Sequence, residues 1–87
     1  MNRVEYLLVC LMEECAEVQQ AAAKALRFGL TDQNLDDLYG EYVDVAAVFG
    51  MLADTVPSLE RSPSEMSERK QSKADKVNSY LQQDTAQ

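Results

Sequence analysis

The sequence of 87 residues contains no histidine and no tryptophan, and it has only two cysteines. Without histidine, the chain cannot form a histidine-containing zinc site or a di-iron bundle site of the Glu-x-x-His kind. Cys10 and Cys15 are too few for a zinc site of their own or for a disulfide framework. We interpret both as free thiols of a protein in a reducing compartment.

The chain also lacks a long apolar run and a signal-peptide pattern. No stretch approaches the roughly 20 apolar residues of a membrane span. The apolar segment within residues 1–12 is followed at once by Glu13, Glu14 and Glu17, without a small-residue cleavage site. We therefore expect a cytoplasmic protein that does not act at a membrane.

Basic residues are scarce, since eight Lys and Arg stand against 15 Asp and Glu, which gives a formal net charge of −7. This balance argues against binding to a nucleic acid polymer, which needs a basic surface. It also suits an anionic small molecule poorly, unless acidic residues hold a divalent cation that in turn holds phosphates. The alternative is that the charge only keeps the protein soluble.

Three segments show helical periodicity, and no segment shows a strand pattern. The first, residues 4–28, is rich in good helix formers and is followed by Gly29 as a C-terminal stop. The second, residues 34–55, has Asp32 or Asn34 as its predicted capping residue, and a proline follows shortly after its end. These two segments are expected to form the main helices of the fold.

The third helix is predicted over residues 62–82, beginning with a capping box at Ser62-Pro63-Ser64-Glu65. We expect one all-α domain over residues 1–82, with a frayed tail over residues 83–87. A chain this short buries a modest core, so its helices are expected to form a bundle that a partner subunit completes.

Acidic residues stand where core residues are expected. At about 100° per residue, Glu14 falls in the middle of the apolar stripe of the first helix, with Glu17 at its edge. Glu41 and Asp44 repeat this arrangement on the second helix. A spacing of three residues puts both members of each pair on one helix face. If the two helices pack antiparallel through their stripes, the two pairs meet.

Four carboxylates that meet in a partly buried site repel one another and lose hydration. Protonation would neutralise them through raised pKa values, whereas a hard divalent cation such as Mg²⁺, Mn²⁺ or Ca²⁺ would bind the oxygens directly. The alternative is that each acid forms a salt bridge with a Lys or Arg of a neighbouring helix. We favour the metal, because the pair recurs on two successive stripes.

Four basic residues are candidates for binding phosphate. Lys70 and Lys73 share one face of the third predicted helix with Met66 and Val77, and they could equally pair with the acids. Lys24 and Arg27 lie near the end of the first helix, where the alternative is a solvated face.

At these residues the sequence resembles the MazG-like, all-α nucleoside triphosphate pyrophosphohydrolases. That family carries Glu-Glu-x-x-Glu on one helix and Glu-x-x-Asp on the next. Glu13-Glu14-Cys15-Ala16-Glu17 matches the first motif and Glu41-Tyr42-Val43-Asp44 matches the second. The flanking Leu11-Met12 and Lys24-Ala25-Leu26-Arg27-Phe28-Gly29 are also similar, so that the resemblance covers about residues 5–55.

The resemblance implies an Mg²⁺-dependent hydrolase, with Mn²⁺ as an alternative metal. Its substrate would be a nucleoside triphosphate, cleaved to the monophosphate and pyrophosphate by a homodimer or homotetramer. Glu13 would assist, by orienting water, and Lys70 or Lys73 would contact phosphate. The implied metal ligands are Glu14, Glu17, Glu41 and Asp44.

Two alternatives remain open at the level of sequence. One is an enzyme that resembles phosphoribosyl-ATP pyrophosphohydrolase, which shares the helical scaffold. The other is a non-catalytic helical interaction module whose acids only pair with lysines.

Overall fold

The computed structural model describes the backbone of residues 1–85 and the side chains of residues 1–83. Within this part the chain forms helices and no strand, so the predicted all-α class is confirmed. The elements are α1 (Arg3–Phe28), α2 (Asp32–Thr55), the short 3₁₀-helix η1 (Pro57–Leu59) and α3 (Pro63–Thr85). No helix in residues 1–85 has the length and apolar character needed to cross a membrane.

Helix α1 begins and ends at local signals in the sequence. The Asn2 side chain accepts a hydrogen bond from the backbone N–H of Glu5, and the Glu5 carboxylate accepts one from the backbone N–H of Asn2, which forms a capping box. At the other end, Gly29 has φ of +102°, a conformation that side chains with a Cβ rarely adopt. The predicted stop at Gly29 is confirmed.

Helix α2 is capped by a residue other than the two predicted. The Thr31 hydroxyl accepts from the Asn34 backbone N–H at 3.1 Å, so the prediction of Asp32 or Asn34 as the cap is wrong. Asn34 is instead buried, and its side-chain amide donates to the Gly29 carbonyl oxygen at 2.9 Å. This bond fixes the turn that reverses the chain between α1 and α2.

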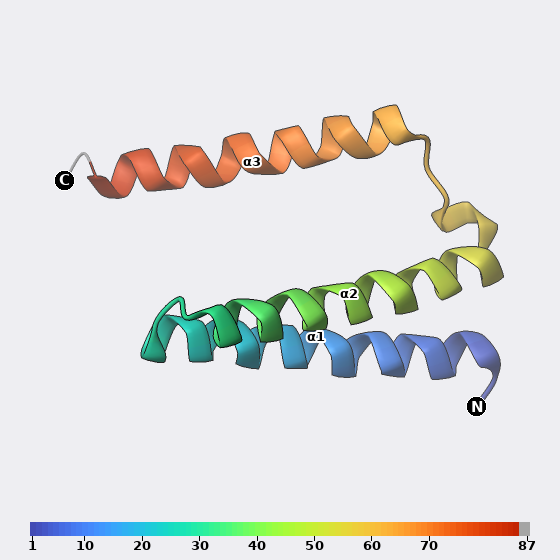
Figure 1. The fold of residues 1–87 in the computed structure, drawn as a ribbon. Helices are drawn as coiled ribbons and strands as arrows, with labels where there is room; N and C mark the ends of the chain where they lie inside the picture. Colours follow the sequence, from blue (N-terminus) through green and yellow to red (C-terminus); the bar gives the residue numbers. More distant parts are fainter. Residues whose placement is uncertain (86–87) are drawn as a thin grey trace.

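Helices α1 and α2 pack antiparallel as a hairpin along most of their length (Figure 1). Their predicted apolar stripes face each other, and the most deeply buried side chains are Leu7 and Leu52, at 2% and 1% exposure. Because the two helices of the hairpin run in opposite directions, the start of α1 lies beside the end of α2 (Figure 1). The packed seam between the two helices positions the acidic residues described below.

Helix α3 runs back alongside the hairpin but packs against neither α1 nor α2 within the described residues (Figure 1). One of the two hydrogen bonds of the predicted capping box at its start is confirmed, because the Ser62 hydroxyl accepts from the Glu65 backbone N–H at 3.2 Å. The Glu65 carboxylate lies 3.4 Å from Arg61 Nε and 3.6 Å from Arg69 Nη2.

The third helix extends further than the periodicity predicts. It continues through Thr85, so residues 83–85 of the predicted frayed tail are helical. The remainder of that prediction, residues 86 and 87, lies outside the described residues.

Candidate metal centre

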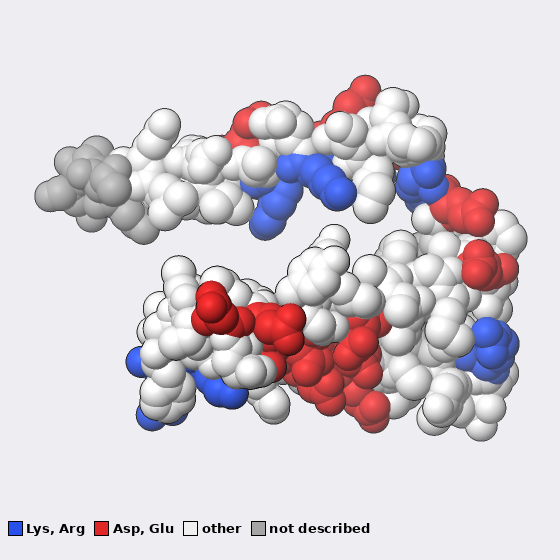
Figure 2. Space-filling model, viewed as in Figure 1, with Lys and Arg blue, Asp and Glu red and all other residues white. Residues whose placement is uncertain are grey.

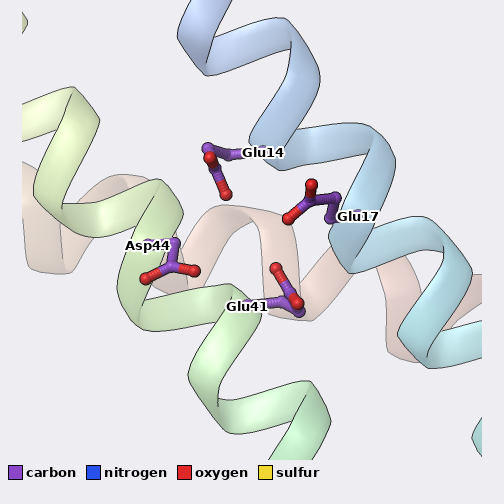
Figure 3. Close-up of side chains that lie close together, drawn as sticks. All are labelled: Glu14, Glu17, Glu41 and Asp44. Carbon is purple, nitrogen blue, oxygen red and sulfur yellow. The ribbon is translucent and has the colours of Figure 1, made fainter.

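Four carboxylates from the two arms of the hairpin converge at the middle of the seam. Each offers one oxygen, and these four oxygens all lie within 4.8 Å of one another. In Figure 3 the side chains point toward one another from the facing sides of α1 and α2. The contributing residues are Glu14, Glu17, Glu41 and Asp44.

The two residues at the centre of the seam are partly withdrawn from water. One carboxylate oxygen of Glu14 and one of Glu41 are buried, and neither has a hydrogen-bond partner. A buried oxygen that bonds to nothing loses hydration without replacement, which costs free energy. Glu17 and Asp44 are exposed, so the cluster also opens to solvent.

Crowding raises the pKa of both central acids. Burial raises the pKa of Glu14 above its usual value, and repulsion from Glu17 and Asp44 adds to it. Hydrogen bonding to Glu17 raises the pKa of Glu41, with burial and repulsion from the same neighbours adding to it. Negative charge is therefore disfavoured at Glu14 and Glu41 unless a cation offsets it.

The alternative that the four clustered acids form salt bridges with Lys or Arg is not supported. None of the ion pairs among the described side chains involves the four clustered carboxylates. The ion pair nearest to them joins Lys24 Nζ of α1 to Asp37 Oδ2 of α2 at 3.4 Å, one turn along the hairpin.

The donor set fits a hard divalent cation. Four carboxylates supply only oxygen ligands, which Mg²⁺, Mn²⁺ and Ca²⁺ prefer. Oxygens already within 4.8 Å of one another can ligate one ion after small side-chain movements. A bound cation would use the two buried oxygens that lack partners and would remove the repulsion that raises the pKa values.

A polar hollow of about 340 Å³ adjoins the cluster. Two of the clustered acids, Glu17 and Glu41, form part of its lining, and Lys24 places a positive charge at its wall. The hollow thus brings carboxylate oxygens and an ammonium group to one space. Its lining residues are Glu17, Gln20, Ala21, Lys24, Asp37 and Glu41.

The other predicted residues lie at different places. Glu13 is exposed on α1, close enough to Glu14 for its charge to raise that residue's pKa. The Arg27 guanidinium lies over the Phe28 ring, 5.6 Å from its centroid, in the last turn of α1. Lys70 and Lys73 line a second, separate groove between α2 and α3.

Two residues of the hollow, Gln20 and Asp37, were not among the sequence candidates. Asp37 precedes Glu41 by one helical turn, and Gln20 follows Glu17 by three residues. Extending the i, i+3 and i, i+4 pattern from the four acids along each helix would find both of them. That Gln20 and Asp37 belong to the hollow becomes clear only in the folded hairpin, where Lys24 and Asp37 lie side by side.

Fold and site together define a helical hairpin protein with a four-carboxylate centre in its seam. Comparison of the chain with protein-family models, with curated proteins and with solved structures finds no match. The functional proposal therefore depends on the residues of the site and on the resemblance of their motifs.

Proposed function

We propose that this protein is an Mg²⁺-dependent nucleoside triphosphate pyrophosphohydrolase, releasing a nucleoside monophosphate and pyrophosphate. One observation carries the proposal: two carboxylate oxygens, from Glu14 and Glu41, are buried without partners in a cluster of four acids. The match to the MazG-like motifs at these same residues supports the substrate class. The cytoplasm is the compartment in which we expect it to act.

Each residue of the site has a chemical role in this proposal. Glu14, Glu17, Glu41 and Asp44 hold the cation, which when bound neutralises charge on the triphosphate. Lys24 attracts a phosphate oxygen from the wall of the hollow, and Asp37 fixes the direction of its ammonium group.

The reaction needs an attacking water and a group that accepts its proton. Glu13, exposed beside Glu14, orients the water and takes up the proton as the new bond to the α-phosphorus forms. The anhydride bond between the α- and β-phosphates breaks, and pyrophosphate leaves with its electron pair. As the resemblance implies, Lys70 or Lys73 offsets the remaining phosphate charge; in a single chain both line a separate groove, so a partner subunit would supply them. Arg27 is a further phosphate contact.

A panel of ribo- and deoxyribonucleoside triphosphates, each with Mg²⁺, tests the proposal when pyrophosphate and orthophosphate are scored separately. We expect pyrophosphate with at least one substrate and its loss in excess chelator. Orthophosphate as the only product, or turnover that chelator leaves unchanged, would contradict the proposal.

The same assay separates the alternatives. Turnover of phosphoribosyl-ATP, with none of the triphosphates cleaved, would favour the enzyme of that type. An interaction module would turn over neither. Mn²⁺ in place of Mg²⁺ should support the reaction, because it accepts the same oxygen ligands.

A further inference from the structure

The side of the hairpin that carries the polar hollow continues toward the turn between α1 and α2. On α1, Glu17, Ala21 and Lys24 recur at steps of three and four residues, so they share one face of the helix. All three line the hollow. Phe28 follows Lys24 by four residues and therefore lies on the same face, in the last turn of α1.

The facing helix α2 continues this side of the hairpin in the same way. Asp37 lines the hollow and pairs with Lys24 at 3.4 Å. Gln33 precedes Asp37 by about one turn, and its side-chain amide donates to Asp37 Oδ1 at 2.8 Å. Beyond the pair of Lys24 with Asp37, this side therefore carries an aromatic ring and an uncharged amide, which suit a nucleobase better than a further phosphate.

Phe28 is a large aromatic residue that the single chain leaves uncovered. Its side chain is 68% exposed, so it does not belong to the core that contains Leu7 and Leu52. The Arg27 guanidinium lies over the ring at 5.6 Å from its centroid and adds positive charge beside it. An exposed ring of this kind can stack on a nucleobase, because every base has a π face.

The alternative is that Phe28 is an ordinary surface hydrophobe without a role, which is common in proteins. Leu26 is such a residue, 88% exposed in the same turn of α1. It stands two positions before Phe28 and so lies about 160° away around the helix. Of the two residues, only Phe28 continues the line of Glu17 and Lys24.

The order of groups along this line follows the order of parts in a nucleoside triphosphate. Carboxylates that hold the cation come first, the Lys24 ammonium group follows, and the Phe28 ring comes last. Figure 2 shows acidic side chains over the middle of the hairpin and basic side chains close to its turn. Phe28 stands eleven positions after Glu17, which corresponds to about 16 Å along the helix axis. An extended nucleoside triphosphate has a comparable length.

We infer that Phe28 is the surface on which the nucleobase of the substrate stacks. The nucleotide then lies along this side of the hairpin, with its triphosphate at the carboxylates and its base at the end of α1. The identity of the ligand rests on the proposed function. The stacking surface itself rests on the exposure of Phe28 and on its place in line with the hollow.

Calorimetric binding of Mg²⁺ complexes tests this by separating the base from the phosphates. The probes are α,β-methylene analogues of nucleoside triphosphates with the four common bases, which resist cleavage, and inorganic tripolyphosphate, which has no base. We expect at least one analogue to bind the wild-type chain more tightly than tripolyphosphate. Phe28→Ala should raise the dissociation constant of that analogue roughly 5- to 150-fold and leave that of tripolyphosphate unchanged, because only stacking is lost.

Two further variants distinguish stacking from a structural role of Phe28. Phe28→Tyr keeps an aromatic ring and should bind the analogue as the wild type does. Leu26→Ala is the matched control, because it removes an exposed apolar side chain from the other side of the same turn, and it should change neither dissociation constant. Circular dichroism verifies that each variant retains its helix content.

Three results would overturn the inference. These are an analogue affinity that Phe28→Ala leaves unchanged, equal weakening of analogue and tripolyphosphate by Phe28→Ala, and a wild-type chain that binds tripolyphosphate as tightly as every analogue.

The same measurements keep the stacking surface and the proposed function apart. If the wild-type chain releases pyrophosphate but Phe28→Ala does not weaken the analogue, the function stands and the stacking surface is wrong. If the analogue binds through Phe28 but no triphosphate is cleaved, the stacking surface stands and the function is wrong. Absence of binding by every analogue overturns both.

Discussion

Glu14 and Glu41 occupy helix positions where a leucine or valine would stabilise the hairpin. Burying such a side chain contributes about 1.5–3 kcal/mol, and a carboxylate at the same position loses hydration instead. The two acids sit at the centre of the seam, with an oxygen of each buried and unpaired. Such a cost is typical of residues retained for function and not for stability.

The pKa values predict how the metal-free protein responds to pH. Because the pKa of Glu14 and Glu41 is raised in the folded state, that state binds protons more tightly than the unfolded chain. The free energy of unfolding should therefore fall as pH rises above the ordinary carboxyl range and the two acids lose their protons.

Urea denaturation in chelator at several pH values measures this dependence. Glu14→Gln removes one of the two titrating groups, so the variant should show a shallower decline and greater stability at neutral pH. Stability that stays constant or increases across this range in the wild-type chain would show that the acids are not crowded in the folded state.

Single substitutions at the acids should separate activity from folding. Glu14→Gln and Asp44→Asn each remove one negative ligand while keeping nearly the same volume, so turnover should fall roughly 100-fold or more. Helix content by circular dichroism should remain that of the wild type. Asp36→Asn is the control, because Asp36 is an exposed acid of α2 outside the cluster, and this variant should retain full turnover. Wild-type turnover in both cluster variants would remove these residues from the mechanism.

At the scale of helices, periodicity predicted α1 and α2 closely because each has a continuous apolar stripe. Capping was less predictable. Thr31 caps α2, and the buried Asn34 side chain instead donates to the Gly29 carbonyl oxygen, a contact that the local sequence pattern did not predict. The placement of α3 could not be predicted at all. Lys70 and Lys73 interrupt its apolar stripe, so the sequence left open whether that face packs on acids, on phosphate or on neither.

The convergence of the acids was the part of the site that helical phase could predict. Glu14 and Glu41 lie on the stripes that pack together, so antiparallel pairing of the helices brings them to one place. The ion pair of Lys24 with Asp37 depends on the axial alignment of the hairpin, which the turn at residues 29–31 sets. The rotational position of a residue around one helix does not tell how far that helix is shifted along its neighbour.

The turn between α1 and α2 should control the stability of the hairpin. Asn34→Ala removes the hydrogen bond to the Gly29 carbonyl, and should lower the free energy of unfolding by about 1–2 kcal/mol. Gln33→Ala removes only an exposed hydrogen bond to Asp37 and should cost less than about 0.5 kcal/mol. Chemical denaturation of both variants makes the comparison. Equal losses would mean that the buried amide does not hold the turn.

At the scale of the molecule, large hydrophobic residues of α1 and α2 such as Met12, Tyr42 and Phe49 are exposed, and α3 packs against neither helix within the described residues. We propose, as the family resemblance implies, a homodimer in which a second copy covers these residues and α3 of each chain lies on the site of the other. If both the proposed function and the pairing hold, catalysis is shared between chains, because carboxylates and lysines of one complete site come from different copies.

Mixing two variants tests this sharing. Glu41→Gln and the double variant Lys70→Ala/Lys73→Ala should each be nearly inactive alone. Random exchange of subunits yields about half heterodimers, each with one complete site, and so about a quarter of the wild-type number of sites. Pyrophosphate release should therefore return on mixing. No recovery despite verified subunit exchange, or a lysine variant with full activity, would contradict a shared site.

The central claim is that the four carboxylates of the seam bind a divalent cation, and calorimetric titration of Mg²⁺ into the full chain tests it most directly. We predict a saturable heat of binding for the wild-type chain and for Asp36→Asn, and its loss in Glu41→Gln. Absence of saturable binding in the wild-type chain, or undiminished binding in Glu41→Gln, would contradict the account.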